Sequence, residues 1–360
     1  MAPTTKVHLL ALLSAISAPL ALAHGQVKYV VANGVKNEAG NIYYDGDAKN
    51  KNTATRIQYQ ASWPAYNVPA DFRDNNKMAC ETAGGAPKTV KIDAGSTLQI
   101  YWQGATGELL HKGGIGIATS YNPWVHAMGP IMDYMTDCNG DCKNFNAANA
   151  GWTKVANAGI DMNQHIMSGL SSAMASKPEN YWPRNGNGLW AIAKLVQQGS
   201  RWDVKIPKNL KNGHYIVRNE IAAVHSVLGS DPRSGAQMYV ACVQVEVVNG
   251  GSASLPGGTQ AGQLYSPTGD FAKYNVYSDN VSNFQNFKVP GPAVWDGGSS
   301  SGGGGGGGET PSTGGGGTTP GKTCKKKRSL DAWQEELELV KRGRKSHAHT
   351  AKSRLTALDH

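Results

Sequence analysis

Between residues 24 and 295 the chain is divided into short runs of β-branched and aromatic residues, separated by turns rich in Gly, Asn and Pro. These runs partly alternate apolar with polar residues, which indicates strands, and no segment in this range shows sustained helical periodicity. The pattern predicts an all-β fold, an immunoglobulin or fibronectin-III-like β-sandwich with long loops at 103–126 and 143–200. The expected strands are Val27–Val35, Val90–Trp102 (with a turn inside 91–100), Trp202–Ile206, His214–Val224 and Met238–Val248.

The composition changes abruptly after Trp295. Runs of Gly with Ser, Thr and Pro predict a flexible linker over 297–321, which follows one folded domain over 24–296. Residues 322–360 form a basic C-terminal tail that we expect to be partly disordered.

Residues 1–23 have the features of a secretory signal peptide, because Lys6 precedes a mostly apolar run and Ala21-Leu22-Ala23 is a small-x-small cleavage pattern. Cleavage after Ala23 would make His24 the first residue of the mature chain. A histidine at that position offers two nitrogen donors, the α-amine and the ring Nδ1, and the amine loses its proton more readily than a lysine does. A second imidazole would complete a T of three nitrogens, which favours Cu(II).

The net charge of +9 does not describe the folded domain, because the tail alone carries 11 of the 35 basic and 5 of the 26 acidic residues. The domain is therefore close to neutral, which argues against nucleic acid as a partner. The leader is too short for a confident membrane span, and no later segment is apolar enough to be one. We therefore expect a secreted, extracellular protein that is not a membrane protein and that faces a neutral, hydroxyl-rich ligand.

Five cysteines in an exported chain predict two disulfides and one cysteine left over. Cys138 and Cys142 are close enough in sequence to close a local loop, and Cys80 with Cys242 would then form a long-range bond. Cys324 in the tail is expected to be unpaired or intermolecular. A zinc site is disfavoured, because CxxC pairs with matching histidines are missing. Asn280-Val281-Ser282 is a sequon for N-glycosylation.

Several further motifs occur in a fixed order along the chain, and together they carry a resemblance to a known family. They are His24-Gly25, Gly129-Pro130 shortly after His126, Cys138-x-x-x-Cys142, Glu220-Ile221 before His225, Gln237-x-Tyr239 before Cys242, and the closing Val289–Trp295. In these features the chain resembles the fungal lytic polysaccharide monooxygenases of auxiliary activity family nine. The resemblance covers essentially all of residues 24–295.

One motif departs from the family pattern. The family has one residue between its histidine and Gly-Pro, whereas here Ala127 and Met128 both intervene. We take His126 as the second imidazole because it closely precedes Gly129-Pro130, and His111 is the alternative.

The resemblance implies the following roles. His24 and His126 would hold one copper ion, with Tyr239 at the axial position. His225 and Gln237 would lie next to the metal and handle protons, so they and Tyr239 are the expected catalytic residues. Tyr277 is a candidate for contacting a flat carbohydrate surface.

The implied function is oxidative cleavage of glycosidic bonds, at C1 or C4 of the sugar, in cellulose or related β-glucans including hemicellulose. It requires copper, an external electron donor (a small molecule or a protein) and O2 or H2O2. We expect a monomer. The alternative is a copper-binding protein of the same fold without this activity, while a purely carbohydrate-binding module would not need an N-terminal histidine with His225, Gln237 and Tyr239. A hydrolase is disfavoured because no pair of carboxylates stands out as acid and base.

Overall fold

The computed structural model describes residues 24–59, 66–105, 123–166, 181–184, 187–278 and 280–297, with the backbone alone at His24 and Ala105. The expected leader, His111, Cys324, the tail and nearly all of the linker lie outside the described residues. In the part that is described, no helix has both the length and the apolar character needed to cross a membrane.

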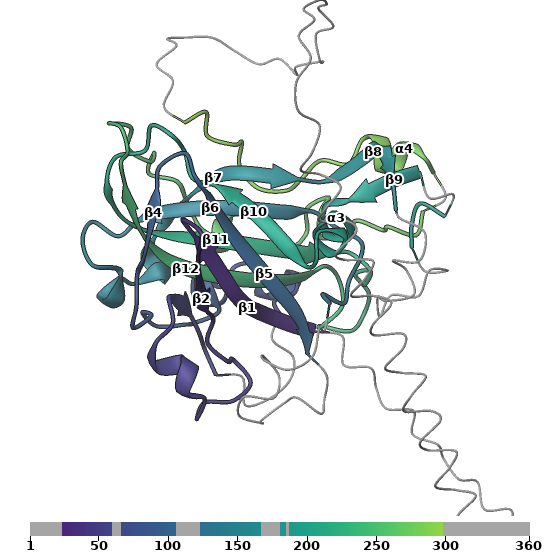
Figure 1. Ribbon diagram of the computed structural model, residues 1–360. Helices are drawn as coiled ribbons and strands as arrows, with labels where there is room; N and C mark the ends of the chain where they lie inside the picture. Colours follow the sequence, from purple (N-terminus) through teal and green to yellow (C-terminus); the bar gives the residue numbers. More distant parts are fainter. Residues whose placement is uncertain are drawn as a thin grey trace, which may run out of the picture. The chain divides into compact units, whose positions relative to one another are not determined.

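Two large β-sheets cross each other face to face (Figure 1). The four-stranded sheet has the order β10-β5-β1-β2, and the larger sheet has the order β13-β7-β6-β11-β12-β3, with β4 paired in parallel to β12. The β-sandwich predicted from the sequence is thus confirmed. The strands of the first sheet are β1 (His24–Ala32), β2 (Val35–Glu38), β5 (Thr97–Ala105) and β10 (Arg201–Lys205). Those of the second are β3 (Thr55–Arg56), β4 (Val90–Asp93), β6 (Ile131–Asp137), β7 (Gly151–Ala158), β11 (Gly213–Ala223), β12 (Gln237–Val248) and β13 (Thr259–Gln260).

Helices are few and short in the described residues. The α-helices are α1 (Asn75–Cys80), α3 (Ala191–Gln197) and α4 (Ser282–Gln285). Single 3-10 turns occur at Ala48–Lys51, Pro69–Asp71, Cys142–Asn144, Ala147–Asn149 and Ala261–Gln263.

The first predicted strand, Val27–Val35, is divided by a turn at Asn33-Gly34, where both residues have positive φ angles of 48° and 78°. An Asn-Gly pair in this conformation makes a two-residue hairpin turn whose twist matches that of the strands it joins. Ala32 therefore pairs with Val35, and β2 runs back along β1.

The prediction of long loops over 143–200 was partly wrong. This range contains β7 and a separate two-stranded sheet of β8 (Ile160–His165) and β9 (Asn187–Trp190), followed by α3. Strand β8 is half-exposed or exposed along its length. Because neither of its faces is buried in the core, it lacks the alternating apolar pattern that reveals a strand in sequence.

Two tryptophans tie the sheets together through the interior. Trp202 on β10 donates its indole N–H to Asp133 on β6 at 3.0 Å, and Trp102 on β5 donates to Asn219 on β11 at 2.9 Å. Asn219 in turn donates to Asp133 at 2.7 Å. All these groups are buried, so the hydrogen bonds satisfy polar atoms that would otherwise be costly in the core.

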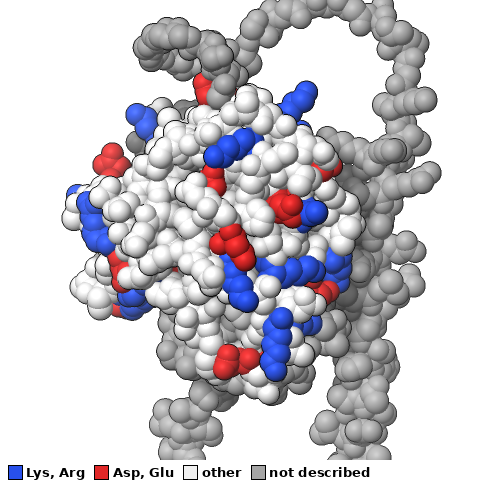
Figure 2. Space-filling model, turned by 90° about the vertical axis from the view of Figure 1, so that its left-hand side faces the viewer, with Lys and Arg blue, Asp and Glu red and all other residues white. Residues whose placement is uncertain are grey.

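The structure contains the disulfides Cys80–Cys242 and Cys138–Cys142. The first joins the end of α1 to β12, and the second closes a short loop after β6. On the face seen in Figure 2, Lys and Arg are interspersed with Asp and Glu and separated by uncharged surface. That face therefore has no large patch of only positive or only negative charge.

Candidate metal centre

His126 lies in the segment that leads into β6, and a glycine brings this segment close to β11. Gly129 has a φ of +137°, and a Cβ atom there would lie 1.9 Å from the carbonyl oxygen of Ala222. Only glycine permits this approach. The amide of Val224 then donates to the carbonyl of Met128 at 3.0 Å. This contact holds His126, which is buried, beside the end of β11.

The imidazole of His126 meets the phenol of Tyr239 from β12. His126 Nε2 lies 2.9 Å from Tyr239 Oη, and this hydroxyl donates to Gln237 Oε1 at 2.8 Å. Gln237 and Tyr239 are two residues apart on one strand, so their side chains share a face. Burial raises the pKa of Tyr239 well above its ordinary value, so the phenol keeps its proton.

His225 follows β11 and stacks on His126, with ring centroids 4.2 Å apart and an interplanar angle of 17°. Its Nδ1 atom is buried and has no hydrogen-bond partner among the described residues. Burial lowers the pKa of His225 to about 4, so the ring is neutral at neutral pH. A neutral imidazole in this position can accept a hydrogen bond at one ring nitrogen and donate one at the other.

A buried tryptophan brings the start of β1 to these residues. Trp124 packs edge-on against His126 and Tyr239, with centroid distances of 5.8 Å and 4.9 Å. A Cβ atom on Gly25 would lie 2.6 Å from the Trp124 ring and 2.0 Å from the carbonyl oxygen of Gln103. Glycine therefore lets β1 lie against the indole.

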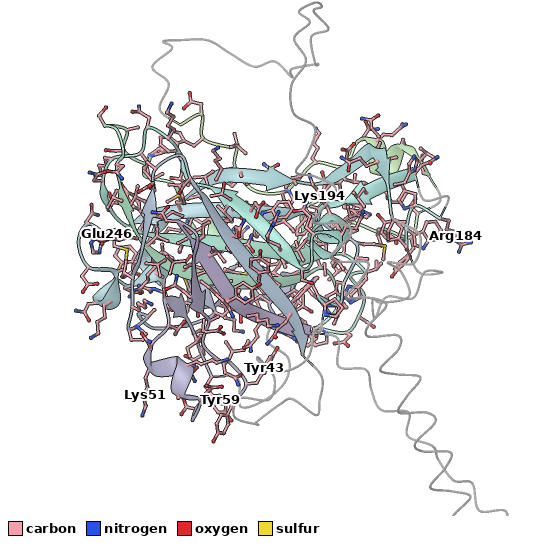
Figure 3. All side chains as sticks on the ribbon, in the orientation of Figure 1. Tyr43, Lys51, Tyr59, Arg184, Lys194 and Glu246 are labelled. Carbon is pink, nitrogen blue, oxygen red and sulfur yellow. A yellow bond between two sulfur atoms is a disulfide. The ribbon has the colours of Figure 1, made fainter. Side chains whose placement is uncertain are left out.

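The backbone of His24 directly precedes this contact and pairs with Ala105 of β5. Tyr43, labelled in Figure 3, donates its hydroxyl to the carbonyl of Gly25 at 3.3 Å and so holds the same end of β1. The side chain of His24 itself lies outside the described residues.

The donors gathered here fit a copper ion. Imidazole nitrogen with a phenol oxygen suits Cu(II), and the amine of a processed His24 would add a further nitrogen. Cys242, three residues beyond Tyr239, is held in a disulfide with Cys80 and so offers no thiolate. The two imidazole rings are also compatible with a metal site. Nε2 of His126 points to the phenol of Tyr239, and Nδ1 of His225 is buried and has no hydrogen-bond partner among the described residues.

Tyr277 lies beside this cluster and is 36% exposed. Its hydroxyl donates to the carbonyl of His225 at 2.8 Å, and its ring packs edge-on against Trp182 at 6.0 Å. The guanidinium of Arg184 lies 4.4 Å from the centroid of the Trp182 ring, at the edge of the molecule in Figure 3.

The sequence reasoning did not identify Trp124, Trp182 or Arg184 as part of this region. Trp124 stands two residues before His126, so its position in the sequence could have indicated that it lies near this histidine. Trp182 and Arg184 lie in a stretch taken for a loop, and nothing in the sequence places them near Tyr277.

The predicted glycosylation residue Asn280 is exposed, on the segment just before α4. Its side-chain oxygen accepts hydrogen bonds from the amide of Ser282 at 3.0 Å and from its hydroxyl at 2.7 Å. These contacts use the side-chain oxygen of Asn280 and not its nitrogen.

Comparison with known proteins gives concordant matches. Residues 24–287 match the model of Auxiliary Activity family 9 (formerly GH61). The AA9 family lytic polysaccharide monooxygenase F of Malbranchea cinnamomea is 32% identical over 287 residues, which cover 78% of this chain and 94% of that protein. The solved structure of Cel61B from Hypocrea jecorina has a TM-score of 0.56 and 26% identity, and covers 76% of this chain and 100% of its own. The extended catalytic domain of H. jecorina LPMO9A has a TM-score of 0.57 and 25% identity, over 76% of this chain and 91% of its own.

Proposed function

Because the chain belongs to Auxiliary Activity family 9, we propose that it is a copper-dependent lytic polysaccharide monooxygenase acting on cellulose or related β-glucans. The observation that supports this most directly is the meeting of His126, His225 and Tyr239 beside the strand that begins at His24. These residues come from separate parts of the sequence. Their assembly beside the first residue of the expected mature chain supports a metal site there.

In this proposal the α-amine and ring of His24, Nε2 of His126 and the phenol of Tyr239 would hold one copper ion. Bound copper supplies one-electron chemistry with O2 or H2O2, which ends in oxidation of the sugar at C1 or C4. His126 Nε2, which contacts the Tyr239 hydroxyl in the structure, would then be the atom that binds the metal. Tyr239 still donates to Gln237, so the phenol stays oriented.

The remaining residues handle protons and substrate. His225 is neutral and stacked on a metal ligand, so it can hold or release a proton at its unpaired Nδ1. Gln237 orients the phenol and offers its amide N–H groups to a reacting oxygen. Tyr277 is half-buried and anchored to the His225 backbone, so its exposed ring can contact a sugar close to the metal.

The remaining features of the proposal are those expected of an exported enzyme. We propose that the leader is removed after Ala23, that the protein is secreted and acts as a monomer with an external electron donor, and that Asn280 is glycosylated. The free amine on His24 exists only after that cleavage, so metal binding by this amine depends on removal of the leader.

The test uses protein with its native N-terminus, loaded with one equivalent of copper. It is incubated with ascorbate, O2 or H2O2, and swollen cellulose, and the soluble products are analysed by mass spectrometry. Oligosaccharides with the mass shifts of aldonic acids or C4-ketones are expected, and a His24→Ala control should make none. Tight copper binding with no oxidised products from cellulose or from a panel of hemicelluloses would reject this function in favour of a copper-binding protein without the activity.

A further inference from the structure

Ser200 lies between α3 and β10 in a backbone conformation that is unfavourable for a serine. Its φ angle is +59°, and the residue before it, Gly199, has a φ of +74°. Glycine adopts such angles at little cost, whereas a residue with a side chain keeps them only where its surroundings impose them. Ser200 is also buried. Its contacts must therefore outweigh the strain of its backbone.

These contacts join Ser200 to the backbones of two tryptophans. Its carbonyl accepts a hydrogen bond from the amide of Trp102 on β5 at 2.8 Å, and its hydroxyl oxygen accepts one from the amide of Trp124 at 2.9 Å. The first contact continues the pairing of β10 with β5 and does not depend on the residue type. The second contact requires an acceptor on the side chain. The serine hydroxyl is therefore needed to satisfy the buried amide of Trp124.

The segment that carries His126 is held on both sides of this histidine by α3 and the residues after it. Two residues before the histidine, Trp124 is held by the hydroxyl of Ser200. Three residues after it, the carbonyl of Gly129 accepts a hydrogen bond from the amide of Ile192, in the first turn of α3, at 3.3 Å. The position of His126 therefore depends on contacts at both ends of α3.

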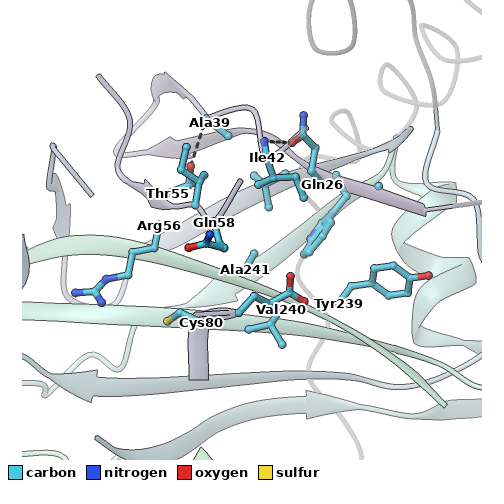
Figure 4. A pocket seen from close by; sticks show the side chains of 16 residues that line it. Gln26, Ala39, Ile42, Thr55, Arg56, Gln58, Cys80, Tyr239, Val240 and Ala241 are labelled. Atoms are coloured by element: carbon cyan, nitrogen blue, oxygen red, sulfur yellow. Dashed lines mark hydrogen bonds between the residues drawn. The ribbon is translucent and has the colours of Figure 1, made fainter. Parts of the chain in front are cut away.

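Trp124 also connects this segment to the rest of the site. Its ring packs edge-on against His126 and Tyr239, and it lies against the backbone of Gly25 at the start of β1. Gly25 and Tyr239 line a cavity of about 40 Å³ together with Trp102, and Tyr239 is labelled there in Figure 4. Because side chains do not fill this cavity, the contacts of the Trp124 ring matter more for the spacing between β1 and Tyr239.

We propose that Ser200 is a positioning residue for the metal centre: its hydroxyl holds Trp124, and through Trp124 it fixes the imidazole of His126 relative to the start of β1. The inference rests on the proposed function, because it concerns a ligand of that site. Without the hydroxyl, the buried amide of Trp124 would lose its acceptor. The segment would then shift towards another partner or water, and His126 would move with it.

The test compares Ser200→Ala with Ser200→Gly, since both variants remove the acceptor. Only the glycine variant also relieves the strain of the positive φ angle, so it should be more stable to urea than the alanine variant. Val204→Ala is the matched control, because Val204 is a fully buried residue of β10 whose truncation destabilises the protein without removing the acceptor. Two quantities are measured: amide hydrogen exchange at Trp124 in the metal-free protein, and the electron paramagnetic resonance spectrum of the Cu(II) form.

Both Ser200 variants are expected to speed exchange at Trp124 about fivefold relative to Val204→Ala, and to change the Cu(II) spectrum in the same way although their stabilities differ. Val204→Ala should keep the wild-type spectrum. Exchange at Trp124 no faster than in Val204→Ala would overturn the proposal. So would wild-type spectra for both Ser200 variants, or a spectral change in Ser200→Ala that Ser200→Gly does not share.

The proposed function can fail separately from this inference. Wild-type protein that binds copper but releases no oxidised sugars would reject the function alone, because the spectra of the variants would still report on the ligands of the copper. Wild-type protein that binds no copper would reject both.

Discussion

The imidazole rings of His126 and His225 lie face to face at 4.2 Å, yet only the edge of His126 points at the phenol of Tyr239. In the proposed function this arrangement divides their roles: His126 would present a nitrogen to the metal, while His225 keeps a buried Nδ1 that has no partner among the described residues. We expect His126→Ala to weaken copper binding more than 100-fold. His225→Ala should keep copper affinity within about tenfold but lower the turnover rate about 100-fold or more.

Isothermal titration with copper and initial rates of oxidised product release measure these two effects. His214→Ala is a suitable control, because His214 lies at the opposite end of β11 from His225. If His225→Ala lost copper affinity as completely as His126→Ala, the division of roles would be wrong.

Gly25 is a point at which a single methyl group should damage the centre. Its Cβ would collide with the Gln103 carbonyl and the Trp124 ring, so Gly25→Ala must displace the start of β1. We expect the free energy of unfolding to fall by about 1–3 kcal/mol, and copper affinity to fall with it. Gly257→Ala is the control, because a Cβ there meets nothing within 4 Å. Equal unfolding curves and copper affinities for the two variants would contradict the close packing of β1 on Trp124.

Asp133 should make stability depend on pH. Burial raises its pKa from 3.8 to about 7 against the opposing effect of the hydrogen bonds from Trp202 and Asn219. Below pH 3.8 both folded and unfolded states hold the proton, and this contribution is fully present. As the pH rises from 3.8 to 7 the unfolded state ionises first, so stability falls by up to about 4 kcal/mol.

Urea unfolding of the metal-free protein at pH values between 4 and 8 measures this slope. Asp133→Asn should make the decline smaller, whereas Asp203→Asn, a change at an exposed aspartate on β10, should leave it in place. A decline of the same size in Asp133→Asn would show that other groups cause it.

The exposed turn at Asn280 should carry an N-linked glycan in protein secreted by a fungal host. Asn280→Gln and Ser282→Ala should both lack the added mass, because the hydroxyl of Ser282 contacts the Asn280 side chain in the structure. Asn283→Gln, a change three residues away and outside any sequon, should keep it. Intact-mass measurement before and after enzymatic deglycosylation decides the matter, and wild-type protein at its unmodified mass would refute the site.

Part of the fold could be predicted because it depends on residues that are neighbours in the sequence. Asn33-Gly34 sets the first hairpin, and the β-branched runs around β5, β11 and β12 are long enough to be recognised as strands. Strands β7, β8 and β9 were missed. They carry fewer alternating apolar residues, since β8 is not buried on either face, and their pairing depends on neighbours distant in the sequence.

For the metal centre, the sequence by itself determined the residue types and their order: an N-terminal His-Gly after cleavage, a histidine before Gly-Pro, and Gln-x-Tyr on one face of a strand. Tertiary structure alone decided that His126 stacks on His225 and that Trp124 packs against both Tyr239 and the start of β1. The physical reason is that these contacts are made between strands, where side-chain packing and unpaired backbone groups select the partner. Neither the packing of a side chain nor the partner of an unpaired backbone group can be inferred from one position of the chain.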